Sequence, residues 1–216
     1  MFQLTKYLDI ISPLALLVFA LLRGNIQLRR DYIFWFIMCQ ALINGIAIIY
    51  DKLLLKDNLF LYHINCGLSF TILTIYFISI IKLRNIKFFI YIAAFLFFLF
   101  FVINLSIWEN LQTFNSNSFS IASLIIVTYS LLYYLENLLN PDTVNIAGSK
   151  HFWFVTGLLT YYASNFFIFV TYRYFTQNNI QATGILWQTH NVIFLMLCLY
   201  LLKGMICKPL QEKYSL

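Results

Sequence analysis

The residues of this chain whose types could do chemistry are amides, phenols and histidines that interrupt long apolar stretches. Such groups can hydrogen-bond a ligand, and imidazole can also bind a metal or transfer a proton. A polar group within an apolar stretch of this kind is costly to bury, so it faces a partner or a cavity. The candidate ligand-binding residues are Tyr62, His63, Asn65, Tyr161, Asn165, Trp187, His190 and Asn191.

Helical spacing groups several of these candidates. Trp187, His190 and Phe194 recur at the i, i+3 and i+7 positions of one helical face, and Tyr161 and Asn165 lie four residues apart. Such a face can pack and hydrogen-bond against a neighbouring helix, or it can contact a ligand. Both interpretations remain open from the spacing alone.

The motifs of common enzymes and metal sites are absent from the chain. There is no HExxH, GxSxG or phosphate-binding loop. His63, His190 and the distant Glu109 do not form a metal-ligand pattern. We therefore assign no catalytic residue, metal or cofactor and do not expect a self-sufficient enzyme. An intramembrane lipid-modifying enzyme that uses one of the two histidines stays an alternative.

Seven apolar segments must position these side chains. A helix needs about 20 residues to cross a hydrocarbon core of about 30 Å, and only 10% of this chain is charged, against about 25% in soluble domains. The composition predicts an all-α integral membrane bundle, a single domain over residues 1–216, with no room for a nucleic-acid-binding domain. The predicted spans are Leu8–Leu22, Ile33–Tyr50, Leu59–Ile81, Phe88–Ile107, Phe119–Leu135, Phe152–Tyr172 and Ile185–Leu202.

The distribution of positive charge predicts the orientation. With seven spans, ten of the 14 Lys and Arg residues fall on one side of the bilayer and four on the other. Because Lys and Arg collect in cytoplasmic loops, the amino end is predicted outside and the carboxyl end inside. The predicted location is the inner membrane of a bacterium. In this orientation the candidate residues lie mainly in the outer part of the membrane, which favours a polar pocket that opens outward.

The segments also differ in polarity. Phe88–Ile107 has almost no polar face, so we expect much of its surface to meet lipid. The segments Ile33–Tyr50, Leu59–Ile81, Phe119–Leu135, Phe152–Tyr172 and Ile185–Leu202 each carry polar residues, and we expect them to surround the interior.

Short motifs along the chain resemble those of a known group. They are Leu61-Tyr62-His63, Phe114-Asn115-Ser116, the spaced set Phe152, Trp153, Gly157, Leu159, Tyr161, Asn165 and Phe167, and the pair Trp187 and His190. On these motifs, residues 58–203 resemble an uncharacterised group of small seven-span proteins of Bacteroidetes. That group tends to carry Glu in its third and fifth spans, whereas this chain reads Gly67-Leu68-Ser69 and Ile121-Ala122-Ser123 there. The resemblance implies a sensor-like membrane module without an established activity.

These observations together favour a sensory or accessory membrane module. We expect it to bind a small or lipidic ligand from the extracytoplasmic side and to act through a membrane or cytoplasmic signalling partner. A transporter of small molecules or lipids is the main alternative, beside the lipid-modifying enzyme. The lipid bilayer is the expected environment, nucleic acid is not an expected partner, and self-association remains open.

Overall fold

The computed structural model describes residues 5, 7–23, 31–54, 57–140, 146–178 and 180–207. Within these ranges the chain forms seven α-helices and one short 3-10 helix, without a β-strand. The elements are α2 (Leu8–Leu22), α4 (Tyr32–Lys52), α5 (Leu59–Ile80), α6 (Arg84–Ile107), α7 (Ser116–Leu139), η1 (Ile146–Gly148), α8 (Lys150–Asn178) and α9 (Ile180–Ile206). The prediction of an all-α bundle is confirmed.

Six of these helices, α4 to α9, are long and apolar enough to cross a membrane. Uninterrupted helices satisfy their own backbone hydrogen bonds, as a segment without water around it must. The six helices indicate a multi-pass protein of a lipid bilayer. The remaining helix, α2, is apolar but has 15 residues, which corresponds to about 22 Å of length. It is shorter than the core of a bilayer, so the count of seven spans stays a prediction.

The predicted apolar ranges each lie within one helix, apart from Ile81, which is the residue that follows α5. Most helices extend past the predicted ends because polar residues at the rims continue the helical backbone. The orientation stays a prediction as well. Several cations used for it lie outside the described residues: Lys6, Arg29, Arg30, Lys56, Lys208 and Lys213.

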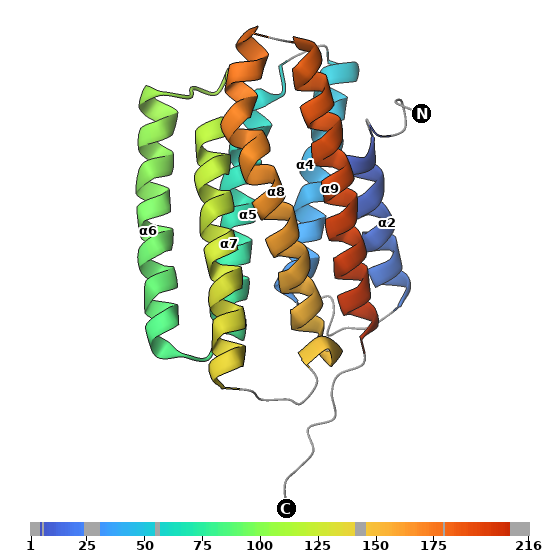
Figure 1. Ribbon diagram of the computed structural model, residues 1–216. Helices are drawn as coiled ribbons and strands as arrows, with labels where there is room; N and C mark the ends of the chain where they lie inside the picture. The colour runs from blue at the N-terminus through green and yellow to red at the C-terminus, as the bar shows by residue number, and fades with distance from the viewer. Residues whose placement is uncertain are drawn as a thin grey trace, which may run out of the picture.

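Six helices form a closed ring, in the order α2, α4, α5, α7, α8, α9 and back to α2 (Figure 1). Neighbours in this ring pack against each other along their lengths, and α8 with α9 forms the most extensive pair. The helix α6 lies outside the ring at one edge of the molecule, against α7 and α5. The interior is therefore surrounded by the five helices expected from their polarity, with α2 as a sixth.

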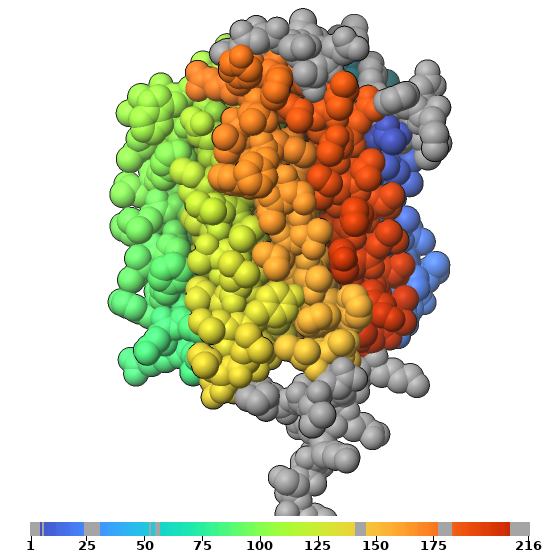
Figure 2. Space-filling model, viewed as in Figure 1, coloured from blue at the N-terminus to red at the C-terminus, as the bar shows by residue number. Residues whose placement is uncertain are grey.

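The outward surface of α6 is apolar and aromatic. Phe88 is 66% exposed and Phe95 is 69% exposed, whereas Ile90 and Phe97 face the bundle and are buried. Figure 2 shows α6 standing at the edge of the face that it shares with α7, α8 and α9. This arrangement agrees with the expectation that this segment has a large surface for lipid.

The bundle has two ends. We call the end where α4 ends, α5 begins and α6 connects to α7 the pocket end. The opposite end is where α5 ends and α6 begins. Large side chains fill the ring toward the opposite end. Its fully buried residues include Phe36, Ile37, Leu73, Tyr76, Phe77, Phe154, Leu158 and Leu201.

Polar contacts also join the helices at the opposite end. Asp31 begins α4 by accepting a hydrogen bond from the backbone N–H of Ile33, and its other oxygen pairs with Lys150 Nζ at 2.7 Å. Arg23 donates to the carbonyl of Met205, which ties the end of α2 to the end of α9. These contacts fix the starts and ends of helices that are distant in sequence.

Candidate functional site

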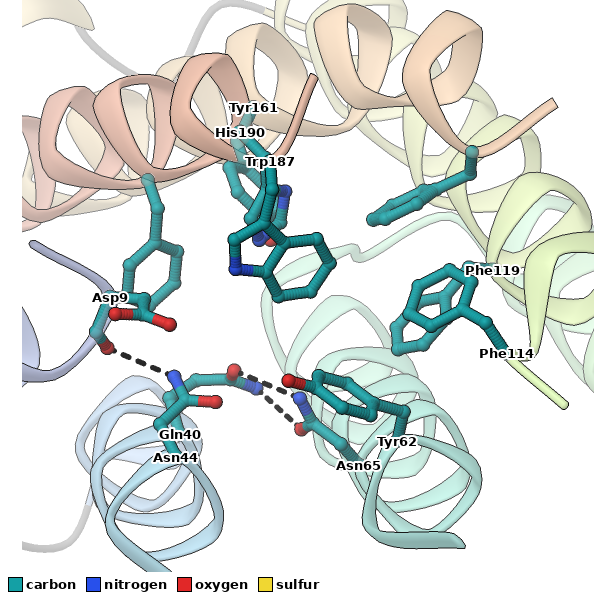
Figure 3. Close-up of a pocket in the computed structure, with 12 residues that line it drawn as sticks. Asp9, Gln40, Asn44, Tyr62, Asn65, Phe114, Phe119, Tyr161, Trp187 and His190 are labelled. Carbon is teal, nitrogen blue, oxygen red and sulfur yellow. Dashed lines mark hydrogen bonds between the residues drawn. The ribbon is translucent and has the colours of Figure 1, made fainter. Parts of the chain in front are cut away.

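A small cavity lies inside the ring at the pocket end (Figure 3). Its volume is about 30 Å³, which on the scale of buried water sites holds one or two water molecules. Each of the six ring helices contributes to its wall, and α6 contributes no residue. The lining residues are Asp9, Gln40, Asn44, Tyr62, Asn65, Phe114, Phe119, Tyr161, Phe169, Trp187, His190 and Phe194.

A proline in α2 explains how this helix is joined to the cavity wall. Pro13 has no N–H, so the helical hydrogen bond that residue 13 would donate to the carbonyl of Asp9 cannot form. Asn44 of α4 supplies the missing donor, because its Nδ2 lies 2.9 Å from the Asp9 carbonyl oxygen. The Asp9 carbonyl, which lacks a partner within α2, thus joins α2 to α4 beside the cavity.

The carboxylate of Asp9 is the one acidic group among the lining residues. Its Oδ1 atom is buried and has no hydrogen-bond partner among the described residues. Figure 3 shows the Asp9 carboxylate beside Asn44, on the side of the cavity where α2 and α4 meet. Burying a carboxylate oxygen without a hydrogen-bond donor costs free energy. A donor or a positive charge bound beside Asp9 Oδ1 would reduce that cost.

An amide pair joins α4 to α5 at the floor of the cavity. Gln40 Nε2 donates to Asn65 Oδ1 at 2.9 Å and to Ser69 Oγ at 2.6 Å, and Asn65 Nδ2 donates back to Gln40 Oε1 at 3.2 Å. All three residues are buried. The amide groups satisfy one another, which is the usual condition for burying them. The pair therefore holds two helices together and leaves both Nε2 hydrogens of Gln40 occupied.

His190 is positioned by Asn165 of the neighbouring helix α8. The Asn165 amide nitrogen donates to the carbonyl of Tyr161, and its oxygen lies 2.7 Å from His190 Nδ1. An acceptor at that distance requires a hydrogen on Nδ1, so in the neutral ring Nε2 keeps its lone pair. The imidazole also stacks on Trp187, with ring centroids 5.0 Å apart. His190 thus adds a fixed ring with one remaining acceptor to the cavity wall.

Aromatic rings close the cavity toward the pocket end. Phe114, in the connection between α6 and α7, lies at 5.4 Å from Tyr62, 5.9 Å from Trp187 and 4.4 Å from Tyr172, measured between ring centroids. It also stacks with Phe119. The ring of Phe114 is therefore the centre of an aromatic cluster that brings together α5, α7, α8 and α9.

The connection that carries Phe114 is held by buried polar groups. His63 Nε2 lies 3.0 Å from the carbonyl oxygen of Thr113, so it donates the hydrogen bond and leaves Nδ1 buried without a partner among the described residues. Glu109, which is 1% exposed, accepts hydrogen bonds from Asn104 Nδ2 at 2.8 Å and from the backbone N–H of Asn117. These contacts hold Thr113, which precedes Phe114, and the start of α7, which follows it.

The residues predicted for ligand binding divide into two sets. Five of them, Tyr62, Asn65, Tyr161, Trp187 and His190, line the cavity. The other three lie outside the lining and are almost fully buried in helix contacts: His63 on Thr113, Asn165 on His190 and Asn191 on the carbonyl of Thr5. Whether any of the eight contacts a ligand stays a prediction.

Sequence reasoning did not select Asp9, Gln40 or Asn44, although all three line the cavity. A signal for Asp9 was present, since it is the one charged residue in the first apolar segment. A lone charge in such a segment marks a functional position by default. Gln40 and Asn44 are also polar residues of an apolar segment, four apart and therefore on one helical face.

The cavity can bind a ligand through hydrogen bonds and through the faces of aromatic rings. Its lining contains no cluster of metal ligands. Among the described residues, no three His, Cys, Asp or Glu side chains come close enough to hold a metal ion. Comparisons of this chain with protein-family models, with curated proteins and with solved structures find no match. The resemblance to the seven-span group of Bacteroidetes therefore stays a prediction.

Proposed function

We propose that this protein is a sensory or accessory module of the bacterial inner membrane that binds a small ligand in the cavity at the pocket end. In this proposal α2 is a seventh span, the pocket end faces the extracytoplasmic side, and the bound state is passed to a partner protein. The observation that carries the proposal is the cavity itself, which all six ring helices line with polar and aromatic groups.

The difference between the two halves of the ring supports binding rather than transport. Beyond the cavity, toward the opposite end, the interior is filled by side chains such as Leu73, Tyr76 and Phe154, each at most 1% exposed. A site that is walled by several helices and blocked on one side can sense a ligand through small changes in helix packing. A transporter would have to open this packed half in an alternative state.

Cysteine accessibility tests the cavity and the orientation together. In a background without the four native cysteines, Asn44→Cys places a thiol on the cavity wall, and Ile37→Cys places one in the packed core of the same helix. Silver ion, a thiol reagent small enough for a cavity of about 30 Å³, is added to right-side-out and to inside-out vesicles. We expect Asn44→Cys to react from the extracytoplasmic side only, and Ile37→Cys to react from neither side.

Two loop variants provide matched controls for the orientation. Asn85→Cys, at the start of α6, and Asn110→Cys, in the α6–α7 connection, change the same residue type at exposed positions of opposite ends. Only Asn110→Cys should react with a membrane-impermeant reagent outside intact cells. Reaction of Asn44→Cys from both sides would favour a transporter, and failure to react from either side would overturn the binding proposal.

A further inference from the structure

The cavity presents hydrogen-bond acceptors without a matching cation. Asp9 Oδ1 is buried without a partner, and the neutral His190 ring keeps an acceptor at Nε2. The lining residues carry donors, but none of them reaches Asp9 Oδ1: Gln40 gives both Nε2 hydrogens to α5, and Asn44 Nδ2 donates to the Asp9 carbonyl. None of the twelve lining residues is Lys or Arg. The cavity therefore favours a ligand that donates hydrogen bonds and carries positive charge.

The rest of the wall suits an organic cation better than a hard metal ion. Tyr62, Trp187, Phe114 and Phe119 place aromatic rings around the same space. Ring faces attract ammonium groups, whereas Mg²⁺ and Ca²⁺ require six or more oxygen ligands. One carboxylate with an aromatic wall is a poor set of ligands for those ions.

The volume sets the size of the ligand. A cavity of about 30 Å³ has room for one or two groups of the size of water, which is the size of an ammonium ion or of a primary ammonium head group. A longer amine would have to leave its remaining atoms among the rings around Phe114. The cavity as it stands does not hold a larger metabolite.

We propose that the cavity binds ammonium or the head group of a primary amine, with the Asp9 carboxylate as counter-ion and the aromatic wall as its apolar support. This inference rests on the proposed function and specifies the ligand class of the same site. The –NH₃⁺ group donates to Asp9 Oδ1 and to His190 Nε2. It thereby supplies the partner that the protein does not provide to the buried Oδ1 atom of Asp9.

Titration with methylammonium chloride tests the inference. The full-length protein in lipid nanodiscs is titrated calorimetrically at constant ionic strength, with sodium chloride as the balancing salt. We expect saturable binding that Asp9→Asn weakens about tenfold or more, because the isosteric amide removes the negative charge. The matched control Asp57→Asn changes an exposed carboxylate at the same end and should bind as the wild type does.

A second variant keeps the test informative if Asp9→Asn binds less methylammonium only because it folds poorly. Trp187→Leu removes a ring from the wall and leaves the carboxylate in place, so it should also weaken methylammonium binding while retaining helical circular dichroism. Equal binding by the wild type and by both of these variants would overturn the inference. Displacement of methylammonium by an equal concentration of sodium would overturn it as well.

Titrations with methanol and with formate separate failure of this inference from failure of the proposed function. Methanol is neutral and has the two heavy atoms of methylammonium, and formate is an anion with three. Binding of either one, lost in Trp187→Leu, without binding of methylammonium would overturn the cation and preserve a small-ligand site. If none of the three solutes binds and Asn44→Cys does not react, both proposals are wrong.

Discussion

Carboxylates with buried oxygens differ in their hydrogen-bond partners between the two ends of the bundle. At the opposite end, Glu136 of α7 is 6% exposed and accepts hydrogen bonds from the backbone N–H groups of Lys82 and Leu83, which directly precede α6. The first N–H groups of a helix have no partner within it and attract an anion. Glu136 therefore joins α7 to the start of α6. At the pocket end, Asp9 has a buried oxygen without such a partner.

Glu109 shows that the difference is not simply one between ends. It also lies at the pocket end, yet its carboxylate accepts from Asn104 and from the backbone N–H of Asn117 near the start of α7. Donors occupy both carboxylate oxygens of Glu136 and of Glu109, whereas Asp9, in the first turn of α2, keeps one buried oxygen without a donor. A carboxylate in this protein is therefore structural where the chain supplies donors to both of its oxygens. Where one oxygen faces a cavity without a donor, that oxygen is available to a ligand.

Helix packing follows the same division along α9. At the opposite end, a Cβ atom on Gly204 would overlap the ring of Phe154 and meet the carbonyl oxygen of Lys150 at 3.0 Å. Near the pocket end of the same helix, a Cβ atom on Gly184 would meet nothing within 4 Å. The opposite end is close-packed at Gly204, whereas Gly184 is exposed and faces open space.

The largest expected effect comes from neutralising Glu136. Glu136→Gln removes the charge and one of the two acceptor oxygens that serve Lys82 and Leu83, so we expect a loss of about 2 kcal/mol in the free energy of unfolding. The same change at Asp9 should cost less than about 0.5 kcal/mol or should stabilise the protein, since the buried Oδ1 atom has no hydrogen-bond partner to lose. Unfolding in mixed micelles measures both. A larger loss for Asp9→Asn than for Glu136→Gln would contradict the comparison.

The two glycines of α9 provide the next test. Gly204→Ala should destabilise the protein by about 1–2 kcal/mol, because Phe154 is fully buried and has little room to move. Gly184→Ala, the matched control, should be neutral or stabilise by about 0.5 kcal/mol through helix propensity. Thermal unfolding of the two variants side by side measures this difference, and equal midpoints would show that α9 is not closely packed at Gly204.

The smallest expected effect concerns the contact between α2 and α4. Asn44→Ala removes the donor to the Asp9 carbonyl and should cost about 1 kcal/mol. In a Pro13→Ala background residue 13 regains its N–H, which can satisfy that carbonyl within α2, so the cost of Asn44→Ala should fall to near zero. A double-mutant cycle in the same micelle assay measures the coupling. Additive effects would show that Asn44 does not compensate for the proline.

Much of the fold could be predicted because the relevant signals are local. Long segments with almost no charge specify helices, and each predicted segment lies in one helix, except that Ile81, the last residue of its segment, follows α5. The phenylalanine-rich segment Phe88–Ile107 was expected to meet lipid, and α6 does lie outside the ring. Five of eight candidate residues line one cavity because residues on a single polar face, such as Trp187 and His190, turn inward together.

The sequence by itself determined the helices, their apolar lengths and the polar face of each. The tertiary structure alone decided which polar side chains share a cavity and which satisfy one another. Helical periodicity fixes a residue's direction relative to its own helix, whereas the rotation of that helix and its neighbours in the ring depend on packing across the whole bundle. Asp9 and His190 stand 181 positions apart in the chain and line the same 30 Å³ space. Asn165, which looked equally suited to a ligand, is used instead to orient His190.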